Sequence, residues 1–471
     1  MGRPAGGASA RGLGRTGRNR LVAPESRERR APVQEKDWFT WAKEQTDPAA
    51  AFAKPEALEG LVVLDASHGH MGGVVCSSVL AEFGAEVIRV EPPGGDVARK
   101  FTPEGLMVGD AGLGYLVEGR NKWHVTLNLH CEEGRRLFRH LAGRADVVIE
   151  TFRPGVMDAW GLGYRQLSRV NPRLIYLAVY NFGQFGPRAQ CGQPDAEIVS
   201  QAASGIAYIT GEPDDLAPPE CAVPTRVGSW LGWYAAGLFG AFGVLAALNY
   251  RAVSGEGQFI DVSGVEAVMR LIDYNIVWYH TQGQVKQRIG NFDTAVYPYT
   301  FARCRDGYVL IAAYNDQAFR TLTEIIGRPE LLEDPRFNSF LERTKLENEG
   351  PLLEIIEQWT TRYTAEEIVA HIQEHIRHKR GPAAAVVTGR VNNARETLAQ
   401  ENWWVRGLFR KIRDPRYGEC LVQMPPWKMA HTPPRVKWVC RPVGADNEHV
   451  YGKYLGYGPA KLRELREAGV I

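Results

Sequence analysis

The sequence predicts an α/β protein. A large domain is expected to hold a Rossmann-like, doubly wound parallel sheet, and a smaller domain is expected to be α+β. Two observations predict this class. Short, continuous apolar runs alternate with helical segments between residues 61 and 179, which is typical of βαβ units. Further along, an Asp-Gly pair at residues 306–307 separates two apolar runs, which predicts a β-hairpin outside that sheet.

The strands expected in the large sheet are continuous apolar runs, as is usual for strands that are buried on both faces. They span residues 61–65, 86–91, 146–150 and 174–179. A turn of small residues at 69–73 leads into a helix, and a second helix is expected around residues 132–141. Ligands of doubly wound sheets bind beyond the carboxyl ends of the strands, so the loops after Asp65, Glu91 and Glu150 are candidate binding loops.

The smaller domain is predicted from the second half of the chain. Its hairpin spans residues 303–311, and helical periodicity follows. The predicted helices span residues 317–326, 351–361 and 364–378, and a terminal helix is expected at 460–468.

Composition is that of a soluble globular enzyme, with 44% hydrophobic and 23% charged residues among 471. The net charge of +2 is too small to predict a nucleic-acid or membrane-surface partner. The seven cysteines include no CxxC pair, which favours a reducing cytoplasm over a disulfide framework or a zinc site.

One stretch, residues 227–250, contains no charged side chain and is long enough to span a bilayer. It is rich in Gly and Ala, and it stands alone in the chain. We therefore interpret it as a tightly packed, buried helix and expect no membrane partner.

Residues 1–54 form a Gly- and Arg-rich arm that we expect to be disordered. Within it, residues 12–17 (GLGRTG) match the GxGxxG dinucleotide fingerprint. That motif approaches pyrophosphate only between a strand and a helix, and no strand precedes it here. We interpret the match as a coincidence.

Seven short segments follow one another in a fixed order along the chain. They are residues 58–65 (LEGLVVLD), 80–96 (LAEFGAEVIRVEPPGGD), 146–155 (DVVIETFRPG), 183–187 (GQFGP), 201–205 (QAASG), 447–449 (NEH) and 455–457 (LGY). Together they resemble the class III (CaiB/BaiF-type) CoA-transferases, and the resemblance covers about residues 58–471.

This resemblance implies how the chain is divided after the arm. Residues 55–285 would form the large CoA-binding domain, 286–390 the small α+β domain, and 391–471 a segment that returns to the large domain. It also implies two subunits threaded through each other as interlocked rings. The implied substrates are an acyl-CoA and a carboxylic acid, with no tightly bound cofactor.

The family's CoA pocket implies a set of binding residues in this chain. They are His68, His70, Met71, Leu127, His130, Thr151, Phe152 and Arg153. Coenzyme A needs donors for its phosphates and apolar walls for its adenine. Each residue could instead serve the fold, as core or as a satisfied loop polar group. His130 stands where the family often has Lys or Arg, and Thr151 stands where it often has Asn. Both differences weaken the expected polar contacts. His68 and His70 have no third ligand, so no metal site is predicted.

The family carries an aspartate nucleophile at the start of the long apolar helix, in a segment similar to residues 224–237 (PTRVGSWLGWYAAG). That carboxylate attacks the acyl-CoA thioester and becomes an enzyme-bound CoA thioester. Trp233 stands at this position, and an indole has no ionisable oxygen that could form an anhydride. The family's racemase branch needs the same aspartate and a histidine, at whose position this chain has Ala196. A racemase is not expected.

Glu197 is the candidate replacement carboxylate, because it lies four residues before Gln201, which the family places close to the active site. Alternatively, Glu197 orients the acyl group or is simply solvated, since covalent catalysis requires placement within a fraction of an ångström. Other carboxylates in nearby loops are Asp195, Asp214, Asp215 and Glu220.

Three functions remain open. The chain could be the subunit without the nucleophile in a hetero-oligomeric CoA-transferase whose homologous sister chain carries the aspartate. Residues 193–201 (QPDAEIVSQ) resemble the succinyl-CoA:benzylsuccinate type, which has two unlike subunits. It could be an autonomous homodimeric transferase that uses Glu197 or another carboxylate, or a non-catalytic CoA-binding protein. Aromatic residues that suit a bulky acid, or else form core, are Trp230, Trp233, Tyr234, Tyr274 and Trp278.

Overall fold

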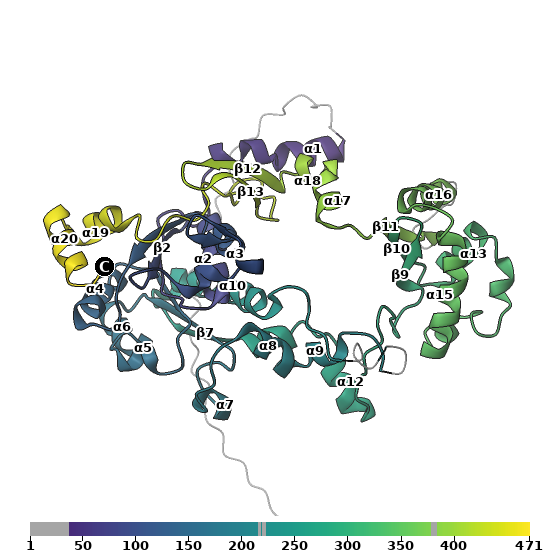
Figure 1. Cartoon of the computed structure of the whole chain (residues 1–471), viewed down its shortest axis with the longest axis horizontal. Coiled ribbons are helices and arrows are strands. Elements are labelled where there is room, and N and C mark those ends of the chain that lie inside the picture. Colours follow the sequence, from purple (N-terminus) through teal and green to yellow (C-terminus); the bar gives the residue numbers. More distant parts are fainter. Residues whose placement is uncertain (1–36, 215–217, 219–222, 378–383) are drawn as a thin grey trace, which may run out of the picture. The chain divides into compact units, whose positions relative to one another are not determined.

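The computed structural model describes residues 37–214, 218, 223–377 and 384–471 (Figure 1). The GxGxxG match and two of the candidate carboxylates, Asp215 and Glu220, lie outside these residues. By internal contacts, the chain up to Gln45 is one unit, and Thr46–Ile471 is a second.

The described part of the predicted arm differs from the expected disorder. Helix α1 spans Trp38–Gln45, and a 3-10 helix, η1, spans Pro48–Ala53. Each has an aspartate at its start. The Asp37 carboxylate accepts hydrogen bonds from the backbone N–H groups of Phe39 and Thr40, and Asp47 accepts one from Ala49. These local caps satisfy backbone donors that an arm of this composition would otherwise leave to water.

A six-stranded parallel sheet forms the centre of the large domain. Its strands are β1 (Val62–Asp65), β2 (Glu86–Glu91), β5 (Lys122–Thr126), β6 (Val147–Glu150), β7 (Ile175–Tyr180) and β8 (Phe259–Ser263). They lie in the order β5-β2-β1-β6-β7-β8, and every neighbouring pair is parallel. The chain therefore runs outward from β1 to one edge and then from β6 to the other, which confirms the predicted doubly wound sheet.

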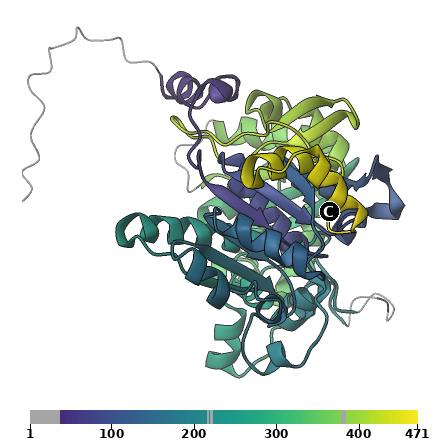
Figure 2. The same ribbon diagram turned by 90° about the vertical axis from the view of Figure 1, so that its left-hand side faces the viewer.

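Helices cover both faces of this sheet. One face packs on α2 (Met71–Glu82), α10 (Leu231–Ser254) and α11 (Gly264–Met269). The other packs on α4 (Glu132–Ala142), α6 (Tyr164–Val170), α19 (Asn447–Leu455) and α20 (Pro459–Glu467). In both views the C-terminal helices, drawn in yellow, lie beside the sheet (Figures 1 and 2).

Hydrogen bonds attach the C-terminal residues to the edge of the sheet at β5. The backbone N–H of His124 donates to Asp446 Oδ2 over 2.8 Å, and that of Thr126 donates to Asn447 Oδ1 over 2.9 Å. These bonds join residues more than 300 positions apart, so backbone N–H groups of the edge strand β5 find these partners only when the end of the chain returns to the sheet.

Helix α10 corresponds to the long apolar stretch of the sequence. Its length and composition would allow it to cross a bilayer, but half of its most apolar window is buried inside the protein. It packs closely against α2, because a Cβ at Gly237 would lie 2.6 Å from the carbonyl oxygen of Gly72. Small residues therefore allow two helix backbones to approach, which agrees with the buried helix predicted for this stretch.

The smaller α+β region contains an antiparallel sheet of β9 (Tyr299–Cys304), β10 (Gly307–Ala312) and β11 (Val387–Arg390). It packs on α13 (Asp316–Ile325), α15 (Leu346–Thr360) and α16 (Ala365–Arg377) around one apolar core. The predicted hairpin is β9 with β10, and its turn lies at the Asp-Gly pair.

Shorter elements connect these layers. Two-stranded ribbons are formed by β3 (Met107–Val108) with β4 (Ala111–Gly112) and by β12 (Phe409–Asp414) with β13 (Gly418–Gln423). The remaining α-helices are α3 (Leu113–Glu118), α5 (Val156–Ala159), α7 (Pro187–Gln190), α8 (Glu197–Ser204), α9 (Ile206–Ile209), α12 (Asn275–Gln282), α14 (Phe340–Arg343), α17 (Ala394–Ala399) and α18 (Glu401–Val405), and the 3-10 helices are η2 (Val97–Lys100), η3 (Pro103–Gly105) and η4 (Pro329–Leu332).

A fully buried arginine on β2 fixes the loops at the carboxyl edge of the sheet. The Arg89 guanidinium pairs with Asp65 at 3.3 Å and with Asp96, and it donates to the carbonyl oxygen of Ser67. Burial by itself raises the pKa of Asp65. The positive charges of Arg89 and Lys122 oppose this effect, and the net pKa of Asp65 lies below its ordinary value. The carboxylate therefore stays charged, and the loop after β1 is held by a charged network rather than by apolar packing.

We predict that Arg89→Met strongly destabilises the fold, because it leaves Asp65 and Asp96 buried without their guanidinium. The expected loss in the free energy of unfolding is about 3–5 kcal/mol. Urea unfolding followed by circular dichroism measures it. The matched control is Arg303→Met, whose guanidinium pairs with Glu357 on the surface and whose side chain is 69% exposed. It should change stability by less than about 1 kcal/mol. Equal losses in the two variants would contradict this account.

Candidate active site

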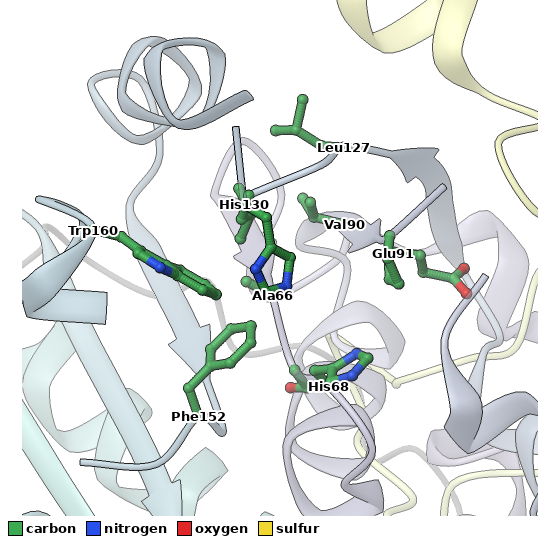
Figure 3. A pocket seen from close by; sticks show the side chains of 11 residues that line it. Ala66, His68, Val90, Glu91, Leu127, His130, Phe152 and Trp160 are labelled. Carbon is green, nitrogen blue, oxygen red and sulfur yellow. The ribbon is translucent and has the colours of Figure 1, made fainter. Parts of the chain in front are cut away.

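A pocket opens at the carboxyl edge of the sheet, where β1 and β6 lie side by side and the chain turns from one half of the sheet to the other (Figure 3). Its walls come from the loops that follow β1, β2, β5 and β6. The lining residues are Ala66, Ser67, His68, Val90, Glu91, Pro92, Leu127, Leu129, His130, Phe152 and Trp160. This crevice is where doubly wound sheets bind their ligands.

Four rings line this pocket, and Figure 3 labels them: His68, His130, Phe152 and Trp160. His68 and Phe152 are nearly parallel, with ring centroids 6.0 Å apart. Trp160 meets Phe152 edge-on at 5.2 Å and His130 edge-on at 5.1 Å. Such an arrangement offers ring faces and edges on several sides, and it can hold a flat aromatic group.

Four of the residues predicted from sequence line the pocket together: His68, Leu127, His130 and Phe152. Trp160 lines it as well and was not predicted. It lies ten residues beyond β6, between α5 and α6, and no motif marks it. Its position depends on the path of the chain after Gly155, which has a positive φ of 84°.

The other predicted residues lie outside the lining. Thr151 is buried, and its Oγ1 accepts a hydrogen bond of 2.9 Å from the backbone N–H of His68, so it positions the histidine. Met71 is fully buried at the start of α2. The Arg153 side chain is exposed, and its Nη1 donates to the carbonyl oxygen of Gly192 at 3.4 Å.

His70 caps helix α2. Its Nδ1 accepts a hydrogen bond of 2.9 Å from the backbone N–H of Gly72, so the neutral ring carries its proton on Nε2. Nε2 lies 3.5 Å from Asp195 Oδ2. Burial lowers the pKa of His70 in spite of the nearby carboxylate, so the ring is neutral at neutral pH.

Glu91 lines the pocket with its stem, but its carboxylate points away from the four rings (Figure 3). It pairs with Arg99 at 2.6 Å and with His124 at 2.8 Å. Burial raises the pKa of Glu91, but Arg99 and His124 hold the net pKa well below its ordinary value. This carboxylate therefore stabilises the fold and does not contribute to the ring-lined pocket.

Trp233, which the sequence motif predicts to stand at the family's nucleophile position, is 7% exposed and lies on the first turn of α10. Its ring stacks on Phe101 at 5.4 Å and contacts His70 at 5.5 Å and Trp230 at 5.7 Å. The indole Nε1 is buried without a hydrogen-bond partner among the described residues. The indole is thus packed in an aromatic cluster.

Glu197 is buried at the start of α8, and its Oε1 is occupied. This oxygen accepts a hydrogen bond of 2.9 Å from the backbone N–H of Gly232 and one of 2.8 Å from Gln201 Nε2. The Gln201 Oε1 in turn accepts from the backbone N–H of Val227. Glu197 therefore acts from another helix as an N-terminal cap of α10.

The remaining candidates also have structural contacts. Asp195 Oδ2 accepts a hydrogen bond from the backbone N–H of Asn181, and Asp214 pairs with Arg288. Tyr234 donates to Glu118 at 3.2 Å. Tyr274 and Trp278 pack on each other with centroids 6.1 Å apart, and neither lines the pocket.

The fold and pocket define an α/β protein with a ligand crevice at the switch point of its sheet, and comparison with known proteins identifies its family. The pattern of CoA-transferase family III matches residues 58–447. The succinyl-CoA–D-citramalate CoA-transferase of Chloroflexus aurantiacus is 34% identical over 420 residues, which cover 88% of this chain and 98% of that protein. The alpha and beta subunits of succinyl-CoA–L-malate CoA-transferase from the same organism are 33% and 34% identical, with 88% of this chain and 92% and 98% of the subunits covered.

A solved structure shows the same architecture. The crystal structure of a CaiB/BaiF family protein from Brucella suis superposes with a TM-score of 0.72 at 27% identity, and the match covers 85% of this chain and all of that one. The chain therefore belongs to CoA-transferase family III, the CaiB/BaiF family, and is an enzyme of the CoA-transferase type. This confirms the resemblance that the sequence motifs indicate.

We predict that Glu197→Ala destabilises the protein without weakening ligand binding in the pocket. Removing the cap leaves the buried N–H of Gly232 unpaired and takes one of two acceptors from Gln201 Nε2, which keeps its hydrogen bond to the carbonyl oxygen of Ser229. The expected loss in the free energy of unfolding is about 1–3 kcal/mol. Urea unfolding measures the loss, and calorimetric titration with CoA measures binding. A variant of unchanged stability would contradict the capping role.

Proposed function

We propose that this chain is the subunit without the nucleophile in a two-chain class III CoA-transferase, and that a homologous sister chain supplies the aspartate. The pair moves CoA from an acyl-CoA to a carboxylic acid. The observation that carries this proposal is the buried indole of Trp233 at the nucleophile position, combined with a pocket that remains open at the switch point of the sheet.

The covalent steps take place on the sister chain's aspartate. Its carboxylate attacks the thioester carbonyl, the CoA thiolate leaves, and a mixed anhydride forms. The thiolate then attacks the aspartyl carbonyl, which releases the first acid and leaves an aspartyl-CoA thioester. The incoming carboxylate repeats the two steps in reverse, so that aspartate is regenerated and the new acyl-CoA departs. No step requires an ionisable side chain at position 233 of this chain.

In this proposal the ring-lined pocket binds the adenine of CoA. Phe152, His68 and Trp160 supply the ring contacts, and Leu127 supplies an apolar wall. Arg153 and His130 provide donors for the phosphates. His70, Met71 and Thr151 contribute indirectly, since they hold the loop after β1 in place.

An exposed apolar stripe on α10 supports the presence of a second chain. One side of this helix is buried in the core, yet other apolar side chains on it are exposed. They are Leu238, Phe239, Phe242, Tyr250 and Val253, with Phe242 73% and Val253 89% exposed. Exposed apolar patches of this kind favour a protein partner. A relative that consists of named alpha and beta subunits gives the precedent for two unlike chains.

The names of the relatives suggest the donor. The D-citramalate and L-malate enzymes both have succinyl-CoA in their names, and we propose succinyl-CoA as the CoA donor here. We propose the cytoplasm as its location, in keeping with the free thiols of the six described cysteines.

Phe152→Ala should weaken CoA binding by the isolated chain, because it removes the central ring of the pocket. We expect the Kd for CoA to rise about tenfold, from loss of roughly 1–2 kcal/mol of stacking. Calorimetric titration measures it. Phe185→Ala is the control, since Phe185 is 81% exposed and does not line the pocket. Indistinguishable Kd values for the two variants would place CoA elsewhere.

The isolated chain should not transfer CoA, and activity should appear only with the sister chain. Succinyl-CoA and a dicarboxylic acid serve as substrates, and hydroxylamine should trap an acylated aspartate on the sister chain alone. Unaided transfer would favour the autonomous enzyme. Binding of CoA without transfer in either state would favour a non-catalytic protein.

Trp233→Asp tests whether a carboxylate at position 233 is enough to give this chain transferase activity. If the pocket is otherwise competent, the isolated variant should gain measurable transfer, whereas Trp233→Asn, which leaves the same cavity without a nucleophile, should stay inert. Both variants lose a buried indole and roughly 3–5 kcal/mol of stability, so circular dichroism must show that they fold. If the Trp233→Asp chain folds but shows no CoA transfer, the result would argue for the non-catalytic alternative.

A further inference from the structure

A second cavity, of about 340 Å³, lies on the face of the large sheet that packs against α4 and α6. Residues of β6, β7 and β8 line it on one side, and those of α5, α6 and the loop after β7 line it on the other. The principal lining residues are Glu150, Met157, Tyr164, Tyr176, Gln184 and Phe259. It shares no lining residue with the ring-lined pocket, so the proposed function does not use it.

Three aromatic rings gather on the wall of this cavity. The centroid of Tyr176 lies 6.2 Å from that of Tyr164 and 6.0 Å from that of Phe259, and Tyr164 lies 5.9 Å from Phe259. The rings are tilted to one another by 30–60°. These rings form an aromatic wall, and the negative faces of aromatic rings attract cations.

A carboxyl group without a basic partner accompanies these rings. Glu150 is 4% exposed, and one of its oxygens accepts a hydrogen bond of 2.7 Å from the backbone N–H of Phe152. Among the described residues no Lys, Arg or His forms an ion pair with it. A buried carboxyl with one hydrogen bond and no counter-charge is costly to ionise, so a cation would find an uncompensated partner there.

Two further polar groups in the cavity have no partner among the described residues. The hydroxyl of Tyr176, a residue that is 2% exposed, forms no hydrogen bond, and neither does Gln184 Nε2. Buried polar groups are nearly always satisfied by protein, water or ligand. These two groups therefore indicate that the cavity receives a polar occupant.

The other charged groups around Glu150 provide no positive charge that would compensate it. Asp158 and Arg165, from α5 and α6, neutralise each other through an ion pair. Asp261, on β8, accepts hydrogen bonds from the backbone N–H of Gln184 and forms no ion pair among the described residues. It raises the pKa of Glu150 further, although burial is the larger cause.

We propose that this cavity binds a small organic cation whose charged nitrogen bears alkyl groups, held between the carboxylate of Glu150 and the ring wall of Tyr164, Tyr176 and Phe259. A bare metal ion is less suited to the site, because among the lining residues only Glu150 offers a carboxylate that is not already in an ion pair. An alkylammonium group uses both parts of the cavity, since its alkyl groups bury against the rings while its charge faces the carboxylate.

Binding of such a cation is linked to a proton. Burial raises the pKa of Glu150 to about 8, so the carboxyl is mostly neutral at pH 7 in the free protein. The cation favours the ionised form and displaces the proton. Apparent affinity should therefore rise as the pH approaches 8 and become constant above it.

The test compares choline with 3,3-dimethyl-1-butanol, a neutral molecule of the same shape, by NMR titration of the full chain at pH 8.5. Choline should bind about tenfold more tightly. Phe259→Ala should weaken choline binding about fivefold. Phe301→Ala, the matched control on β9, should leave it unchanged, since Phe301 and Phe259 are 43% and 41% exposed in strands. Glu150→Gln should remove both the preference for choline and its dependence on pH.

Three results would overturn the proposal. The first is equal binding of the two probes by the unaltered chain. The second is equal loss in Phe259→Ala and Phe301→Ala. The third is an unchanged preference for choline in a folded Glu150→Gln chain. Loss of folding in Glu150→Gln leaves the decision to the two phenylalanine variants, because both residues are partly exposed.

Discussion

The architecture of the ligand crevice depends on the burial of Arg89 between two carboxylates. This charged group is expensive to desolvate, and replacing all of its members together by apolar residues could stabilise the sheet as well. An apolar substitute could not hold the loops, because the guanidinium reaches Asp65 on β1, Asp96 after β2 and the carbonyl oxygen of Ser67 at the same time. The buried charge therefore fixes the direction in which the loop after β1 leaves the sheet.

That loop connects the framework to both parts of the candidate site. Its first residues line the ring-lined pocket, and its last, His70, caps α2 and contacts the indole of Trp233. Hydrogen bonds from the backbone N–H groups of His68 and Gly69, together with the His70 cap, hold this loop in place. The indole of Trp233 lies in a packed aromatic cluster beside His70. In the proposed function, this chain supplies binding and the sister chain supplies the covalent chemistry.

One hydrogen bond connects a lining residue of the second cavity with a lining residue of the ring-lined pocket. Glu150 lines the second cavity, and its carboxyl accepts the backbone N–H of Phe152, which lines the first. The protonation state of Glu150 therefore acts on the strength of a bond that helps to place Phe152, since a charged acceptor binds an N–H about twice as strongly as a neutral one.

The sequence by itself determined the class of fold and the chemistry that is open to the side chain at position 233. Continuous apolar runs predicted β1, β6 and β7, because strands buried on both faces need no polar residue. That the side chain at position 233 cannot form an anhydride follows from the identity of Trp233, whatever its surroundings. By contrast, β5 and β8 were not predicted, since Lys122 and His124 interrupt the apolar pattern of β5 and are buried only through partners from distant parts of the chain.

Only the tertiary structure decided which candidate residues meet. It brought Trp160 to the pocket, assigned Glu197 to the end of α10, and gathered Tyr164, Tyr176 and Phe259 around Glu150. These contacts join residues that are far apart in sequence or that depend on the path of a loop. Local propensity and periodicity carry information about neighbours along the chain. Contacts between distant residues depend instead on how whole layers of structure pack.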